Sequence, residues 1–331
     1  MPADATPEPP SVPWISASPP SMLPRIADNS RMAISHYIKE IGRGKDGARA
    51  LSHEQAADLF GQVLDGSVSE LEIGAFCLAM RIKGETPEEM AGFIAATESR
   101  LQRVPTARRT AVVLPSYNGA RRLPVLTPLL ALLLAREGLP VLVHGAVTEA
   151  KRISSATVLE QLAIAAEAGI EPIAPGQVRY VPTGVLCPGL QRLLEVRRVI
   201  GLRNSAHSLV KLINPCDGDA LVVGSYTHPE YLVSMAATFE LTGQRAMLLR
   251  GTEGEPVADP RRQPQIDVFL HGQRRCVQEA QSGSLVSLPE LPALDAASTA
   301  AYITRVLAGE LPVPAPIARQ VEQILRAVSA S

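Results

Sequence analysis

The sequence contains few cysteines, few aromatic residues and no long apolar run. Its 331 residues include four cysteines, and any two of them are at least 29 positions apart: Cys77, Cys187, Cys216 and Cys276. This spacing excludes a Cys-x-x-Cys metal or redox motif and implies no disulfide framework. We therefore expect a reducing, cytoplasmic environment and no bound metal.

The apolar runs are too short and too interrupted to cross a bilayer. Leu123 to Ala135 and Leu139 to Val143 are bounded or broken by prolines and Arg136, whereas a membrane-spanning helix needs roughly 20 apolar residues. The first residues also lack the basic, apolar and small-residue order of a secretion signal. With 46% hydrophobic and 20% charged residues, a soluble globular protein without a membrane partner is expected.

The net charge of −1 conceals a strongly basic middle segment. Between Arg100 and Lys211 there are 15 Lys or Arg, 6 Glu and no Asp, which gives +9 and leaves −10 for the rest of the chain. A segment of this kind indicates either a solvated surface or a site for an anionic partner.

The pattern along the chain divides it into three parts. Residues 1–30 hold 8 of the 28 prolines and predict a flexible extension. Residues 31–104 predict an all-helical domain, with helices entered at Arg31 and Ser52, over Glu70 to Ile82, and after the Thr86 cap. Residues 105–331 alternate short apolar runs with helical stretches, which favours an α/β domain with a mainly parallel sheet flanked by helices.

Six short runs in the third part predict its strands, and two helical stretches close the chain. The runs are Ala111 to Leu114, Pro140 to Val143, Gly169 to Ile173, Ala220 to Val223, Gln244 to Leu249 and Leu285 to Leu288. The closing helices are expected over Ala296 to Ala308 and Pro316 to Val328.

Several short motifs, in order, resemble the anthranilate phosphoribosyltransferase and class II nucleoside phosphorylase superfamily, which has the glycosyl transferase family 3 fold. They include Lys83-Gly84-Glu85-Thr86, Val143-His144-Gly145-Ala146, Val196-Arg197-Arg198, Gly201-Leu202-Arg203 and Asn214-Pro215. The resemblance covers roughly residues 31–328. It implies a helical domain that forms homodimers, and a cleft between the two domains that is crossed by residues 187–215.

The motifs that would bind phosphoribosyl diphosphate and Mg²⁺ are altered. Where the family has a Gly-Thr-Gly-Gly-Asp loop, this chain has Pro115-Ser116-Tyr117-Asn118-Gly119, and a proline lacks the N–H that would face a phosphate. The acidic pair that holds Mg²⁺ in the family is displaced to Glu253 and Glu255, so no metal and no cofactor is expected. The remaining positions form a vestigial phosphoribosyl site: Ser116, Asn118, Gly119, Thr127, His144 and Gly145.

Basic residues stand around these altered motifs, and the resemblance places them at the cleft. They are Arg121, Arg122, Lys151, Arg152, Arg192, Arg197, Arg198, Arg203 and Lys211. A cationic groove suits an extended polyanion, because each neutralised phosphate releases counterions. The chain also resembles a divergent, YbiB-type branch of the superfamily, which implies binding of DNA and RNA without sequence preference.

Three hypotheses follow. The first is a nucleic-acid-binding protein with no catalytic residues on a degenerate transferase scaffold, its partners being single- or double-stranded DNA and RNA held through their phosphates. The second is a glycosyltransferase or phosphoribosyltransferase acting on an unidentified acceptor. The third is a scaffold or regulatory protein with a merely solvated basic face. With 4% aromatics and no zinc-finger, basic-zipper or RNA-recognition pattern, base-specific recognition is not expected.

The sequence leaves two roles open for one set of apolar residues in the helical domain. Ile73, Phe76, Met80, Phe93 and Ile94 could supply an apolar dimerisation face, or could fill the core of the helical domain itself.

Overall fold

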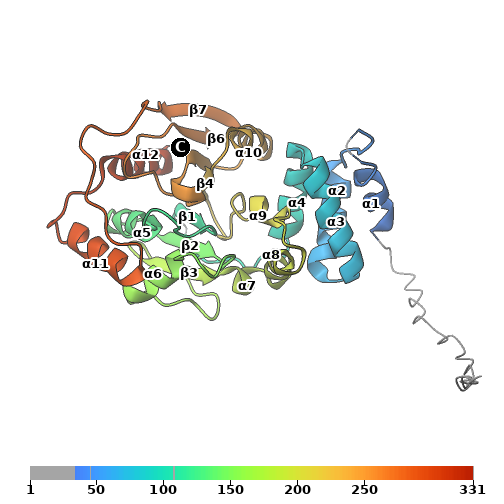
Figure 1. The fold of residues 1–331 in the computed structure, drawn as a ribbon, viewed down its shortest axis with the longest axis horizontal. Helices are drawn as coiled ribbons and strands as arrows, with labels where there is room; N and C mark the ends of the chain where they lie inside the picture. Colours follow the sequence, from blue (N-terminus) through green and yellow to red (C-terminus); the bar gives the residue numbers. More distant parts are fainter. Residues whose placement is uncertain (1–33, 45, 107–108, 331) are drawn as a thin grey trace, which may run out of the picture. The chain divides into compact units, whose positions relative to one another are not determined.

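The computed structural model describes residues 34–44, 46–106 and 109–330, so the extension predicted over residues 1–30 lies outside it, as does the helix start predicted at Arg31. The described chain begins with four helices: α1 (Ser35–Ile41), α2 (His53–Asp65), α3 (Glu70–Lys83) and α4 (Pro87–Glu98) (Figure 1). The helices expected from Ser52, over Glu70 to Ile82 and after Thr86 are confirmed.

Cap residues determine where the helices of this domain begin, and three phenylalanines pack between them. Each of α2, α3 and α4 begins with a reciprocal cap. The hydroxyl of the N-cap residue accepts a hydrogen bond from the backbone N–H of the residue three positions later, and the side chain of that later residue accepts one from the backbone N–H of the N-cap residue. In the core, the ring of Phe60 stacks on Phe93 at 4.5 Å, and Phe76 meets both edge-on. Ile73, Phe76, Met80, Phe93 and Ile94 are therefore core residues.

Within the described residues, seven strands form one sheet in the order β3-β2-β1-β4-β5-β6-β7. The first five in this order are parallel, and β6 and β7 are antiparallel. Their bounds are β1 (Ala111–Ser116), β2 (Val141–Gly145), β3 (Val178–Pro182), β4 (Ala220–Tyr226), β5 (Ala246–Arg250), β6 (Ile266–Leu270) and β7 (Gln273–Gln278). The predicted α/β class with a mainly parallel sheet is confirmed.

Helices cover both faces of the sheet, and alternate strand residues point into two separate cores. In β1, Val112 and Leu114 belong to the core under α5 (Thr127–Arg136), α6 (Ser155–Gln161), α11 (Ala296–Leu307) and α12 (Ala315–Ser329). Ala111 and Val113 belong to the other core, which continues into the helical domain. That core includes residues of α7 (Thr183–Leu186), α8 (Pro188–Ile200), α9 (Ala206–Leu209) and α10 (Pro229–Thr242).

Two of the strand predictions are wrong, and a hairpin was missed. Gly169 to Ile173 forms no strand; β3 begins later, at Val178, where it pairs with Val141 of β2. Leu285 to Leu288 also forms no strand, and its Val286 is fully exposed. The β6–β7 hairpin escaped notice because β7 is a polar edge strand, Gln273–Gln278, without apolar alternation. Both closing helices are confirmed.

The helical domain packs directly on the α/β domain. Helix α8 lies against α2 so closely that a Cβ on Gly189 would come within 2.1 Å of the Leu64 carbonyl oxygen. Arg192 strengthens this contact, because its Nη2 donates to the Val63 carbonyl oxygen at 2.7 Å. Among the described residues, none of the helices combines the length and apolar character that crossing a bilayer requires.

Candidate functional site

A cleft of about 520 Å³ lies at the carboxyl end of β4, lined by residues of α3, α9 and α10. The carboxyl ends of parallel strands are where α/β proteins usually bind ligands. Part of the segment 187–215, which the resemblance places across the cleft, lines it between Arg203 and Lys211. Its charged lining residues are Arg81, Arg203, Lys211, Glu85 and Glu230.

Lys211 lies at the base of the cleft and is 8% exposed. Its Nζ donates to the carbonyl oxygens of Gly254 at 2.8 Å and Ser225 at 3.3 Å. Burial lowers its pKa to about 8, although the nearby Glu255 carboxylate opposes that shift. An ammonium group has three N–H donors, so one remains for a ligand after these two bonds.

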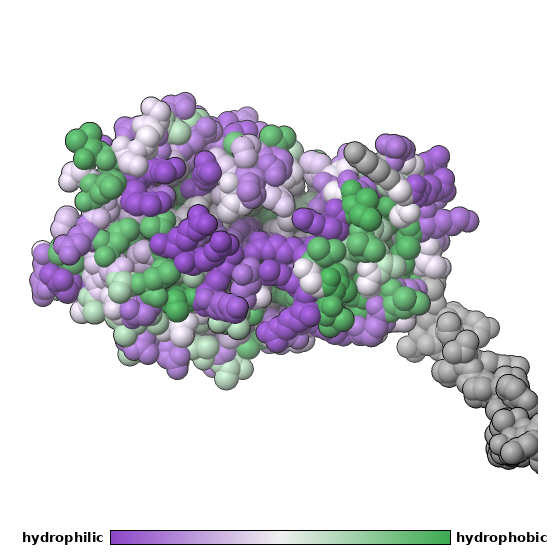
Figure 2. Space-filling model, in the orientation of Figure 1, coloured by the Kyte–Doolittle hydropathy of each residue, from purple (hydrophilic) through white to green (hydrophobic). Residues whose placement is uncertain are grey.

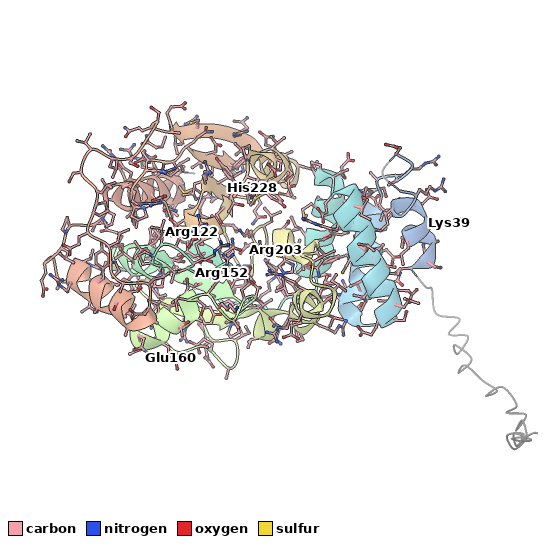
Figure 3. The ribbon with its side chains drawn as sticks, viewed as in Figure 1. Lys39, Arg122, Arg152, Glu160, Arg203 and His228 are labelled. Atoms are coloured by element: carbon pink, nitrogen blue, oxygen red, sulfur yellow. The ribbon has the colours of Figure 1, made fainter. Side chains whose placement is uncertain are left out.

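Beside the cleft, three arginines converge on one carboxylate. Glu149 pairs with Arg152 at 2.9 Å, Arg197 at 3.0 Å and Arg203 at 3.4 Å. We call these three residues the arginine cluster. They come from the loop after β2, from α8, and from the turn after α8, and Arg152 and Arg203 can be seen near one another in Figure 3. Three arginine charges against the one carboxylate of Glu149 give the arginine cluster and Glu149 together a net charge of +2.

The pKa shifts reflect this crowding of cations. Burial raises the pKa of Glu149, but the arginines outweigh it and the net shift is downward. Burial lowers the pKa of Arg203, and the like charge of Arg197 lowers it further. Burial and the same two arginines lower the pKa of His207 to about 4, so this cleft residue is neutral at pH 7.

Two buried side-chain nitrogens in this region have no hydrogen-bond partner within the described part of the chain. They are Nη1 of Arg197 and Nε2 of His207. A buried polar group without a partner costs free energy, and both atoms are covered by the chain, so a ligand would reach them only after side chains move.

The loop expected to be the remnant of a diphosphate site is occupied by the chain's own carboxylate. Oε1 of Glu255 accepts from the backbone N–H groups of Asn118 at 2.7 Å and Gly119 at 2.8 Å. Oε2 accepts from the hydroxyl of Thr127 at 3.1 Å, and also from those of Ser116 and Ser155. We call this set of donors the cradle. Glu255 is 1% exposed, so the cradle holds an internal anion.

Glu253 makes a similar contact next to the cradle. Its Oε2 accepts from the backbone N–H groups of Arg121 at 2.6 Å and Arg122 at 3.0 Å. The turn that presents both carboxylates is tight: Glu253 has φ +53°, and a Cβ on Gly254 would come within 1.9 Å of Asn118 Nδ2. These carboxylates are therefore engaged with the chain itself.

His144 is a core residue. Its Nδ1 lies 2.8 Å from the hydroxyl of Tyr117, which lies 2.8 Å from the Thr183 hydroxyl. Complete burial lowers the pKa of His144 to about 3, so it stays neutral. Gly145 pairs with Ser116 within the β1–β2 ladder.

The other predicted basic residues are dispersed. Arg192 is not brought to the cleft, because its guanidinium holds α8 to α2. Arg121, Arg122, Lys151 and Arg198 are exposed. Figure 2 shows a band of strongly hydrophilic side chains across the middle of one face, where Figure 3 labels Arg122, Arg152 and Arg203.

Several site residues were missed from the sequence. Glu149 lies at the centre of the arginine cluster, but nothing in its local sequence sets it apart from other surface glutamates. Arg81 lines the cleft from α3, a position that only the packing of the two domains determines. Glu255 was noted as a displaced metal ligand, and its contact with the cradle joins residues 137 positions apart.

The comparisons with known proteins agree with this architecture. Residues 35–99 match a glycosyl transferase family, helical bundle domain. An uncharacterized protein of Escherichia coli, YbiB, is 40% identical over 84% of this chain and 88% of its own length. The chain belongs to glycosyl transferase family 3.

Solved members of this family share the fold. Anthranilate phosphoribosyltransferase from Thermus thermophilus superposes with a TM-score of 0.67 at 26% identity, covering 88% of this chain and 87% of that one. The Saccharomyces cerevisiae enzyme, solved in complex with PRPP and Mg, has a TM-score of 0.61 at 12% identity and covers 89% and 98% of the two chains. At this identity, the similarity to the Saccharomyces cerevisiae enzyme shows a shared fold and nothing further.

Proposed function

We propose that this protein binds nucleic acid, without sequence preference, through the cleft and the adjoining arginine cluster. The observation that carries the proposal is the convergence of Arg152, Arg197 and Arg203 on the single carboxylate of Glu149. With Arg81 and Lys211 there are five cations against three carboxylates, those of Glu149, Glu85 and Glu230, which gives a net charge of +2.

A polyanion suits this arrangement better than a small anion does. The cations are spread over α3, α8, the segments before and after α9, and the loop after β2, instead of meeting at one point. A chain of phosphates can contact such a track in several places and releases counterions at each of them. Tyr231 and His228 also line the cleft, and aromatic side chains can stack on bases whatever their identity.

The state of the cradle argues against the alternative of phosphoribosyl transfer. Transfer from a diphosphate requires donors or a metal to stabilise the leaving group. Here Glu255 already accepts from two backbone N–H groups and three hydroxyls of the cradle. A bound diphosphate would have to displace this carboxylate and would be repelled by it.

The homodimer remains a prediction, with a new candidate surface. Because the five residues first considered fill the core, the apolar residues left exposed on α3 are Leu71, Leu78 and Ile82. They recur at spacings of seven and four and so lie on one side of the helix. A second copy of the chain could cover this stripe.

The direct test compares two single variants in a binding assay with labelled single-stranded DNA. Arg203→Ala should weaken binding several-fold, because it removes one cation from the cleft and the cluster. Lys39→Ala is the matched control, since Lys39 is an exposed cation on α1, away from the cleft in Figure 3. Equal affinity of both variants and the wild type would refute the proposed site.

A scaffold with a merely solvated basic face would show no saturable binding at all. A transferase would instead bind phosphoribosyl diphosphate together with Mg²⁺. Because Glu255 fills the cradle, calorimetry should detect no Mg²⁺-dependent binding of phosphoribosyl diphosphate to the wild-type protein.

A further inference from the structure

A second hollow adjoins the cleft, and the functional site described above does not include it. It measures about 760 Å³ and is lined by the loop after β1, the end of β5 and the segment before β6. Tyr226 and Thr227 line both hollows. The two hollows therefore lie on either side of the chain at the end of β4.

The second hollow is strongly basic. Four arginines line it, Arg122, Arg250, Arg261 and Arg262, against the carboxylates of Glu253 and Asp259, which gives a net charge of +2. Both carboxylates are already engaged: Asp259 pairs with the guanidinium of Arg261 at 3.0 Å, and Glu253 accepts from backbone N–H groups.

The other three arginines have no such partners. Within residues 34–44, 46–106 and 109–330, no ion pair and no side-chain hydrogen bond engages Arg122, Arg250 or Arg262, and all three are exposed. They come from three different parts of the chain: the loop after β1, the last residue of β5, and the loop before β6. Three unpaired guanidinium groups around one hollow are suited to phosphate oxygens, which their planar forks can bind in pairs.

We propose that this hollow is a second phosphate-binding site and that it holds the same nucleic-acid strand as the cleft. The inference rests on the proposed function and adds the strandedness of the partner. A flexible single strand can enter two hollows on either side of Tyr226 and Thr227. A duplex is stiff over about 150 base pairs and would contact only the rims.

The test measures binding of single strands of about 5 and about 20 nucleotides; the first is near the lower end of the site sizes of single-strand-binding folds, about 4 to 16 nucleotides, and the second exceeds them. The variant is Arg250→Ala with Arg262→Ala. Its matched control is Arg49→Ala with Arg275→Ala, two exposed arginines outside both hollows.

For the long strand, losing two phosphate contacts should make the fall of log affinity with log salt less steep by about 1.4. This is equivalent to roughly 10- to 30-fold weaker binding near 0.1 M salt. The short strand should bind the variant and the control equally, because it fits within the cleft. The wild type should bind the long single strand more tightly than a duplex of equal length.

Two results would overturn this inference while leaving the proposed function intact: the long strand binding the variant as tightly as the control, or the wild type preferring the duplex. A loss of affinity that is equal for short and long strands would also count against it, because that would indicate a general field effect. Absence of any binding to the wild type would instead refute the proposed function itself.

Discussion

Replacing Glu149 by glutamine should strengthen nucleic-acid binding, which is the opposite of what removing a site residue usually does. Glu149 is the one carboxylate that Arg152, Arg197 and Arg203 share. Glutamine keeps the size and one acceptor oxygen but removes the charge. The three guanidinium groups would then be available to phosphates, and the cluster charge would rise from +2 to +3.

The size of the effect follows from Coulomb's law. A carboxylate about 6 Å from a bound phosphate, at an effective dielectric constant of about 50, repels it by about 1 kcal/mol. Removing that repulsion corresponds to roughly fivefold tighter binding. The protein itself should become slightly less stable, because three partly exposed ion pairs worth about 0.5 kcal/mol each are lost.

The assay is fluorescence anisotropy with a labelled single strand, at constant pH and several salt concentrations, with a thermal melt of each variant. Glu160→Gln is the control, because Glu160 is an exposed glutamate on α6, away from the cluster in Figure 3. Tighter binding by Glu149→Gln alone supports the reasoning. Weaker or unchanged binding by a folded Glu149→Gln variant would refute it.

Three further predictions concern the cradle, Lys211 and the exposed stripe of α3. Glu255→Ala should lower the free energy of unfolding by about 3 to 5 kcal/mol, since five buried donors lose their acceptor. Inorganic pyrophosphate should raise the melting temperature of this variant more than that of the wild type, because only the variant has an empty cradle; an equal rise in both proteins would contradict the role of Glu255 as an internal anion. Because the pKa of Lys211 is lowered to about 8, its charge is lost as the pH rises from 7 to 9. The affinity of the wild type for single-stranded DNA should therefore fall over that range, and the affinity of Lys211→Met should fall less. Parallel pH profiles of the two proteins would exclude Lys211 from binding. Changing Leu71, Leu78 and Ile82 to lysine should convert a dimer to a monomer in sedimentation experiments, whereas an unchanged sedimentation coefficient would place the dimer interface elsewhere.

The sequence was most informative where local rules decide the structure. Ser52, Ser69 and Thr86 each stand three residues before a Gln or Glu, and each begins a helix with the reciprocal cap. The parallel strands β1, β2, β4 and β5 are apolar because both of their faces are buried. The polar edge strand β7 lacks that signal, since its residues are largely exposed.

The site depended on contacts that no local pattern encodes. Arg197 and Arg203 were identified as cleft cations, but their shared partner Glu149 lies 48 and 54 positions away. Arg192 has the same residue type and a similar position on α8, yet it faces α2 and bonds to backbone carbonyl oxygens. Arg192 and Arg197 have different partners only because they lie on different sides of α8, and the packing of α8 decides what each side faces.

The central claim is that the cations of the cleft and the arginine cluster bind a chain of phosphates, and the salt dependence of affinity for single-stranded DNA tests it most directly. If at least four phosphates are neutralised, log affinity should fall with log salt with a slope of about −3 or steeper, at about 0.7 per phosphate. A slope near zero would contradict the claim.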